Sequence, residues 1–126
     1  MKKLIFDWTP VVVWCGLIFY LSGIPDLRSD LPGRWDLIAR KAAHMFEYGI
    51  LAWLFYRAAQ GSWNVSPRLA YWMTFAYCFI YAMGDEYHQS FVPGRYPSFL
   101  DVIIDAAGSM ISLEIVRARI RGGRTV

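Results

Sequence analysis

The sequence is poor in charge and in cysteine. Only 18% of its 126 residues are charged, whereas soluble domains contain about 25%. Its two cysteines, Cys15 and Cys78, fall inside apolar runs, so we expect small buried side chains and no disulfide. No P-loop, dinucleotide fingerprint, internal repeat or low-complexity tract is visible. These absences exclude repeat architectures and give no support to a nucleotide-binding enzyme.

Apolar residues are abundant instead. They make up 56% of the chain, aromatic residues make up 17%, and the mean hydropathy is +0.29. They form four blocks of 16 to 18 residues, namely Leu4–Leu21, Ala42–Ala59, Leu69–Gly84 and Phe99–Val116. This length is near the lower limit for a helix that crosses a ~30 Å hydrocarbon core. The sequence therefore predicts one all-α domain over residues 1–126, a four-helix transmembrane bundle with helices over about 4–21, 42–59, 69–88 and 99–117.

Two alternatives compete with the membrane interpretation. A soluble helical bundle would show a polar stripe along each helix, but residues 69–83, LAYWMTFAYCFIYAM, are apolar or aromatic on every side. The first block also resembles a signal peptide, but the residues LSGIP after it lack a small-x-small cleavage pattern. We therefore favour four membrane spans.

The distribution of lysine and arginine predicts the orientation. With four spans, both termini share one side with the second loop. That side collects eight basic residues, Lys2, Lys3, Arg57, Arg68, Arg117, Arg119, Arg121 and Arg124. The other side has five, Arg28, Arg34, Arg40, Lys41 and Arg95. The positive-inside rule then places both termini in the cytoplasm. The arginine-rich tail is expected to contact anionic lipids and not nucleic acid.

One segment concentrates ionisable groups between apolar runs. Residues 85–105, DEYHQSFVPGRYPSFLDVIID, contain four carboxylates, a histidine, a glutamine and an arginine. Such groups are costly beside hydrocarbon unless they are paired, hydrated or functional. In the four-span arrangement they lie at the outer surface, together with Lys41, His44, Glu47 and Tyr48 from the second helix. The sequence therefore predicts an outward-facing polar pocket.

Helical spacing indicates which side chains face the interior. Lys41, His44 and Tyr48 share one helical face, and so do Asp101, Asp105 and Gly108. Asp85 and Gln89 are four residues apart. Pro93, Gly94 and Pro97 interrupt the helix and hold Arg95 in a short turn. Ser98 and Asp101 match a capping box, which would give both a purely structural role. The residues 23–38 would form an outer loop, with Trp35, Leu37 and Ile38 in a short interfacial helix or lid over the pocket.

Three strings, KAAHMFEYGIL, DEYHQSFVPGRYPSFLD and LSGIP, stand together with the later Gly108. Through these residues the chain resembles the VanZ-like family of small bacterial membrane proteins. The resemblance implies a four-helix membrane domain in the bacterial cell membrane and a link to teicoplanin susceptibility. The residues that match the family pattern are Ser22, Lys41, His44, Tyr48, Asp85, Glu86, Gln89, Pro93, Arg95, Ser98, Asp101 and Gly108. Asp105 departs from the pattern, because asparagine is expected there more often.

The first functional hypothesis is binding of an anionic or zwitterionic head group. Arg95, Lys41 and a protonated His44 would hold phosphate oxygens, and carboxylates would orient these cations. The expected ligand-binding residues are Lys41, His44, Tyr48, Asp85, Glu86, Gln89, Arg95, Ser98, Asp101 and Asp105. The expected partners are membrane lipids, a lipid-linked envelope precursor or a lipoglycopeptide, and a homo-oligomer is conceivable. No cofactor is expected.

Two other hypotheses stay open. A membrane-surface enzyme could use His44, Asp85, Glu86 or Asp101 in catalysis, with His44 as a general base. A divalent ion could assist, held by His44, Glu47, His88 or the carboxylates. No zincin motif or other hydrolase signature supports this. The remaining hypothesis is an ion-pair network that fixes the order of the helices and binds no ligand.

Overall fold

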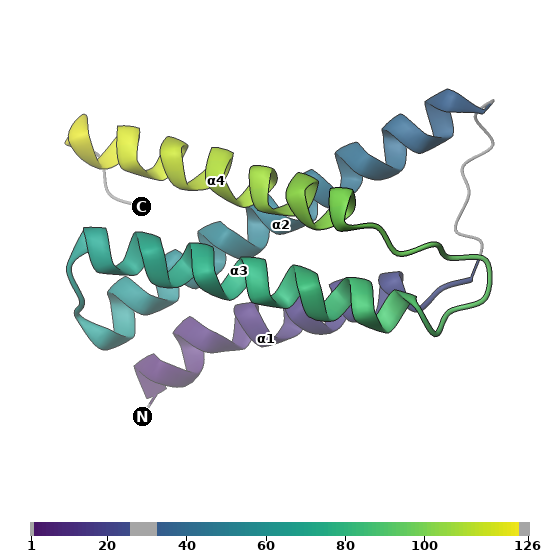
Figure 1. Ribbon diagram of the computed structural model, residues 1–126. Coiled ribbons are helices and arrows are strands. Elements are labelled where there is room, and N and C mark those ends of the chain that lie inside the picture. Colours follow the sequence, from purple (N-terminus) through teal and green to yellow (C-terminus); the bar gives the residue numbers. More distant parts are fainter. Residues whose placement is uncertain (1, 26–32, 124–126) are drawn as a thin grey trace.

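The computed structural model describes residues 2–25 and 33–123, and its described part contains four helices and no strand. The helices are α1 (Lys2–Ser22), α2 (Arg34–Trp63), α3 (Pro67–Gln89) and α4 (Phe99–Arg121) (Figure 1). The predicted all-α class and the four helices are thus confirmed. Each of the four predicted apolar blocks lies within one helix.

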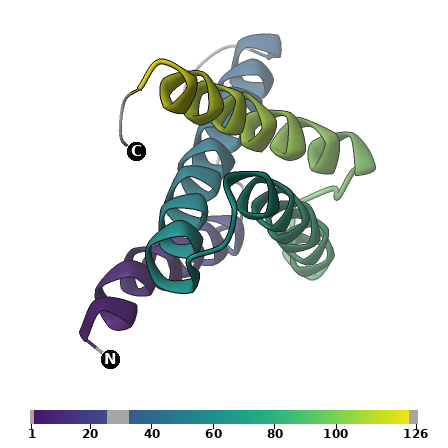
Figure 2. The same ribbon diagram turned by 90° about the vertical axis from the view of Figure 1, so that its left-hand side faces the viewer.

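The helices alternate in direction along the bundle. Both termini lie at one end of the molecule, beside the connection 64–66, and the loop 90–98 lies at the opposite end (Figure 1). We call these the termini end and the Arg95 end. As a consequence, α2 and α4 both start at the Arg95 end and run in the same direction, although α2 crosses the bundle at an angle (Figure 2). The first turns of α2 extend beyond the bundle, and Lys41 and His44, about two to three turns into α2, meet the first turns of α4.

Local sequence signals set the boundary between α2 and α3. Asn64 ends α2 in the left-handed region, with a φ of 49°, which asparagine tolerates better than most residues. Ser66 begins α3 and accepts a hydrogen bond of 3.3 Å from the Leu69 amide through its hydroxyl. Pro67 follows at the first helical position, where its missing amide hydrogen costs nothing. Three residues thus suffice to reverse the chain.

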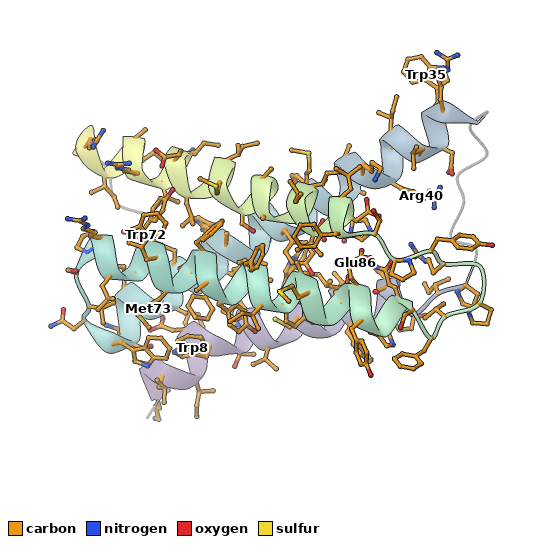
Figure 3. The ribbon with its side chains drawn as sticks, in the orientation of Figure 1. Trp8, Trp35, Arg40, Trp72, Met73 and Glu86 are labelled. Atoms are coloured by element: carbon orange, nitrogen blue, oxygen red, sulfur yellow. The ribbon has the colours of Figure 1, made fainter. Side chains whose placement is uncertain are left out.

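The start of α2 differs from the prediction. The helix has 30 residues and begins at Arg34 instead of near position 42. Its first turns extend beyond the bundle, where charged side chains are compatible with a helix. Trp35, Leu37 and Ile38 are therefore part of α2, and the prediction of a separate short helix or lid was wrong. Trp35 lies at the far end of α2, away from the other helices (Figure 3). The rest of that predicted loop, residues 26–32, lies outside the described residues.

Small residues let the helices approach closely around α2, which crosses the bundle and contacts all three other helices (Figure 2). Alanines at positions 52, 58, 59, 70 and 82 are fully buried. A close approach joins α2 to α4, where Gly108 lies against the backbone of Met45. Such small-residue contacts are typical of helices that pack in membranes.

The distribution of polar and apolar side chains is unusual for a soluble protein. Buried polar residues include Ser22, Thr74, Asp85, Glu86, Gln89, Asp105 and Ser109. Large apolar side chains are exposed on every helix, including Phe6 at 76%, Ile80 at 68% and Phe99 at 67%. Contiguous exposed apolar surface of this kind marks contact with a partner or a membrane.

Only α1 is long and apolar enough, among the described helices, to cross a membrane by length and composition. Charged, tyrosine and tryptophan side chains lower the hydropathy of α2, α3 and α4. The four-span arrangement and the cytoplasmic termini therefore stay predictions. The two cysteines are free, as expected, with Cys78 buried and Cys15 half-buried.

Candidate functional site

Paired charges join α2 to α4 near the Arg95 end. The Lys41 ammonium contacts the Asp101 carboxylate, and both side chains are about one quarter exposed. One turn further along, His44 Nδ1 lies 3.4 Å from Oδ1 of Asp105, whose side chain is fully buried. The helical faces that the spacing predicted thus turn toward each other. Because α2 and α4 run in the same direction, the pairs follow in register.

The interface becomes less charged deeper in the bundle. Tyr48 is completely buried, and its hydroxyl has no hydrogen-bond partner in the part of the chain that the structure describes. The Ser109 hydroxyl donates to the Asp105 carbonyl at 3.1 Å, and the Tyr48 carbonyl lies 3.4 Å from it. Tyr48 therefore contributes packing to this interface and does not line the polar cavity described below.

The end of α3 is hydrogen-bonded to the loop that follows it. The Gln89 amide donates to Asp85 Oδ2 at 3.2 Å, as expected for residues four apart. Glu86 Oε2 accepts a hydrogen bond of 2.8 Å from the Ser98 backbone amide. Figure 3 shows Glu86 on α3 near the start of α4. This contact fixes the entry into α4.

The capping-box prediction is half right. Ser98 caps α4, because its hydroxyl accepts from the Leu100 amide at 3.2 Å. Asp101 does not return the bond to Ser98: its carboxylate pairs with Lys41, and Glu86 takes the Ser98 amide instead. A carboxylate from another helix thus replaces the local one. Sequence spacing alone could not distinguish these two acceptors.

A tight turn places Arg95. The Arg95 amide donates to the Val92 carbonyl at 3.1 Å. Between them stand Pro93 and Gly94, and the φ of Gly94 is 81°. A proline followed by a residue with positive φ is the pattern of a type II turn. The Arg95 guanidinium reaches the carbonyl of Leu21 at the end of α1, with a distance of 3.4 Å from Nη2. The loop is thereby tied to α1.

Arg95 borders a small polar cavity of about 50 Å³ at this end of the bundle. It is lined by Ile18, Leu21, Ser22, Arg40, Ala43, His44, Glu47, Asp85 and Arg95. Three predicted site residues, His44, Asp85 and Arg95, therefore meet. A volume of this size admits only a few water-sized groups. We call it the polar cavity.

The polar cavity includes two charged residues that the predicted ligand set omitted, Arg40 and Glu47. They share a helical face with His44, at spacings of four and three residues, so the same periodicity could have identified them. Arg40 also pairs with Asp36, at 3.0 Å from Nε to Oδ2. In contrast, Lys41 and Asp101 pair with each other beside the cavity. Glu86, Gln89, Ser98 and Asp105 support the surrounding structure and do not line it.

Several polar atoms near this cavity lack a hydrogen-bond partner among the described residues. Arg95 Nε and Asp85 Oδ1 are buried and make no hydrogen bond, although Arg95 as a whole is only half-buried. An unpaired buried polar atom costs about 1–3 kcal/mol. The cavity therefore offers both a donor and an acceptor to a small polar group.

The predicted metal ligands are dispersed. Within residues 2–25 and 33–123, no three His, Cys, Asp or Glu side chains are grouped so that they could hold a metal ion. His88, for example, stacks on Phe19 of α1, with 4.1 Å between ring centroids. Asp101 is engaged by Lys41. A role of His44 as general base stays a hypothesis.

Comparison with known proteins adds one finding. No curated protein and no solved structure matches the chain significantly. The family described as VanZ/LLP1 matches residues 4–120, which include nearly the whole of all four helices and every residue of the polar cavity. This chain therefore belongs to the VanZ/LLP1 family.

Proposed function

We propose that this chain is a multi-pass protein of a bacterial cell membrane, with four spans and cytoplasmic termini. The four helices contain 21, 30, 23 and 23 residues. At about 1.5 Å per residue they are roughly 31 to 45 Å long, which is sufficient for a ~30 Å hydrocarbon core. Exposed apolar residues on all four helices and small or polar residues between them support this placement.

A labelling experiment tests this topology. Tyr96 is 89% exposed at the Arg95 end, and Lys3 is exposed near the start of α1. We expect a membrane-impermeant maleimide to label Tyr96→Cys in intact cells, and to label Lys3→Cys only after permeabilisation. Both variants should carry Cys15→Ala and Cys78→Ala as a common background. Labelling of both positions from the same side would contradict four spans.

We further propose that a zwitterionic membrane lipid binds with its head group at the polar cavity, which is large enough for only part of that head group. The observation that carries this proposal is the Arg95 guanidinium, which is held at the cavity by a type II turn and keeps its Nε without a partner. An arginine held in this way can donate paired hydrogen bonds to phosphate oxygens. In the proposed topology the cavity opens toward the outer leaflet.

The charges around the cavity favour a zwitterion over a simple anion. Two arginines, Arg40 and Arg95, are balanced by two carboxylates, Glu47 and Asp85. A phosphate alone would be repelled by these carboxylates as well as attracted by the arginines. A head group with a phosphate and an ammonium group can satisfy both signs. The teicoplanin link implied by family resemblance fits the same location, because a lipid-tailed glycopeptide would also insert in the outer leaflet.

Replacement of Arg95 by lysine tests the head-group site. We expect Arg95→Lys to weaken binding of a short-chain phosphatidylethanolamine at least about tenfold, because one charge-assisted hydrogen bond contributes about 1.5–3 kcal/mol. Binding is measured by native mass spectrometry and by the lipid-dependent rise in the thermal unfolding midpoint in detergent. Arg95→Lys should reduce the binding of short-chain phosphatidylglycerol, which has no ammonium group, less than it reduces the binding of phosphatidylethanolamine.

Arg34→Lys is the matched control, because Arg34 is exposed at the start of α2 and does not line the cavity. It should bind the lipid normally. The observed pairs Lys41–Asp101 and His44–Asp105 keep the ion-pair network as the competing function. That alternative predicts a lower unfolding midpoint for Arg95→Lys and no lipid-dependent shift in the unmodified protein.

A further inference from the structure

A second cavity lies near the termini end, between α3 and α4, far from the polar cavity. Its volume is about 760 Å³. Three arginines line it: Arg68 in the first turn of α3, and Arg117 and Arg121 one turn apart near the end of α4. All three side chains are exposed. Charge from two helices thus converges on one opening, which we call the arginine groove.

Local contacts leave most of this positive charge available. Glu114, the one acidic residue that lines the arginine groove, accepts a hydrogen bond of 2.8 Å from the Tyr71 hydroxyl. Arg117 Nη1 lies 3.5 Å from the same Glu114 oxygen. Arg68 and Arg121 form no ion pair with any other described residue. Three arginines against one glutamate therefore leave an excess of two positive charges.

The start of α3 adds to the attraction for anions. The first amides of a helix carry a partial positive charge and lack intrahelical partners. Pro67 has no amide hydrogen, and the Ser66 hydroxyl occupies only the Leu69 amide. The Arg68 amide is thus unpaired at the mouth of the arginine groove. An anionic group there would be attracted both by the start of the helix and by the arginines.

The inner wall of the arginine groove is apolar. Tyr56, Leu113 and Val116 line it and are almost completely buried. Trp72 stands at its side, 55% exposed, and Figure 3 shows it on α3 near the termini end. A free phosphate ion would gain nothing from this wall. An amphiphile would gain binding free energy from both parts, because its anionic group would contact the arginines and its acyl chain would pack along the apolar wall.

We propose that the arginine groove binds an anionic phospholipid, with its phosphate at Arg68 and Arg121 and an acyl chain between α3 and α4 beside Trp72. The charge excess and the apolar wall together specify this class of ligand. The site is separate from the polar cavity and prefers a net anionic head group instead of a zwitterion. Either site can therefore be present without the other.

Quenching of Trp72 fluorescence tests this site. The protein is reconstituted in phosphatidylcholine vesicles that contain a minor fraction of phosphatidylglycerol with brominated acyl chains, which quench nearby tryptophans. We expect stronger quenching than with the same fraction of brominated phosphatidylcholine. Trp72→Phe should remove most of the difference between the two lipids. Equal quenching by both lipids would overturn the proposal.

Charge variants identify the residues responsible. Each arginine near a lipid surface contributes about fivefold in affinity, so Arg68→Gln combined with Arg121→Gln should reduce the preference for phosphatidylglycerol by about 25-fold. Arg119→Gln is the matched control, because Arg119 is exposed on the same turn of α4 but does not line the groove. An equal loss with Arg119→Gln would show only general surface attraction and would overturn the site. Full competition by inorganic phosphate would overturn the choice of a lipid.

Discussion

Gly108→Ala is expected to lower the thermal unfolding midpoint more than any other single methyl addition in this chain. A Cβ atom at Gly108 would lie 2.2 Å from the Met45 carbonyl oxygen and 2.8 Å from its carbonyl carbon. Both contacts are with backbone, so α2 and α4 would have to move apart. Overpacking of this kind typically costs about 1–3 kcal/mol and occasionally more. We expect a cost at the upper end, measured by thermal unfolding in detergent and by the yield of folded protein.

Two other glycines provide matched controls. At Gly16 a Cβ would have no atom within 4 Å, so Gly16→Ala should leave stability unchanged or raise it by about 0.5–1 kcal/mol through higher helix propensity. At Gly49 the nearest atom would be the Gly108 carbonyl oxygen at 3.4 Å, and we expect a small effect. Equal unfolding midpoints for Gly108→Ala and Gly16→Ala would contradict the close contact between α2 and α4.

His44→Ala is expected to have the second-largest effect, because it leaves the Asp105 carboxylate without its partner. Asp105 is fully buried, and His44 Nδ1 at 3.4 Å is the one ion-pair partner of its carboxylate in the described part of the chain. Removing one member of a buried pair costs about 3–5 kcal/mol. We expect about 3 kcal/mol, since the His44 side chain is 21% exposed. Thermal unfolding in detergent measures the loss.

A second substitution separates the lost pair from simple loss of packing. His44→Ala combined with Asp105→Asn should recover most of the stability, because an amide carries no charge that needs a partner. His88→Ala is the matched control, since His88 is the other histidine, stacks on Phe19 and forms no ion pair within residues 2–25 and 33–123. It should cost much less. Failure of Asp105→Asn to restore stability would contradict the importance of the pair.

Helical periodicity predicted much of the polar cluster. The spacing of Lys41, His44 and Tyr48 and that of Asp101 and Asp105 placed these groups on facing surfaces, and the structure pairs Lys41 with Asp101 and His44 with Asp105. The periodicity was informative because ionisable groups in an apolar chain have few positions in which their free energy is low. It could not say which member of one face contacts which member of the other. That choice depends on the register of α2 and α4.

Contacts across long stretches of sequence were beyond such reasoning. Ser98 and Asp101 had the spacing of a local capping box, but Glu86 from α3 takes the Ser98 amide. Arg40 appeared only as one charge among those that orient the chain, yet it lines the polar cavity. Its spacing of four residues from His44 placed it on the same helical face, but only the tertiary structure shows that this face of α2 meets Asp85 and Arg95.

The sequence by itself determined the number of helices, the polar character of the segment 85–105 and the family of the chain. These properties depend on composition and on local spacing, which act over a few helical turns. The tertiary structure decided that α2 begins at Arg34, that Arg95 meets Arg40, Glu47 and Asp85, and that the arginines of α3 and α4 converge on one groove. It did so because Gly108 and the buried alanines set how closely the helices pack and at what height their side chains meet.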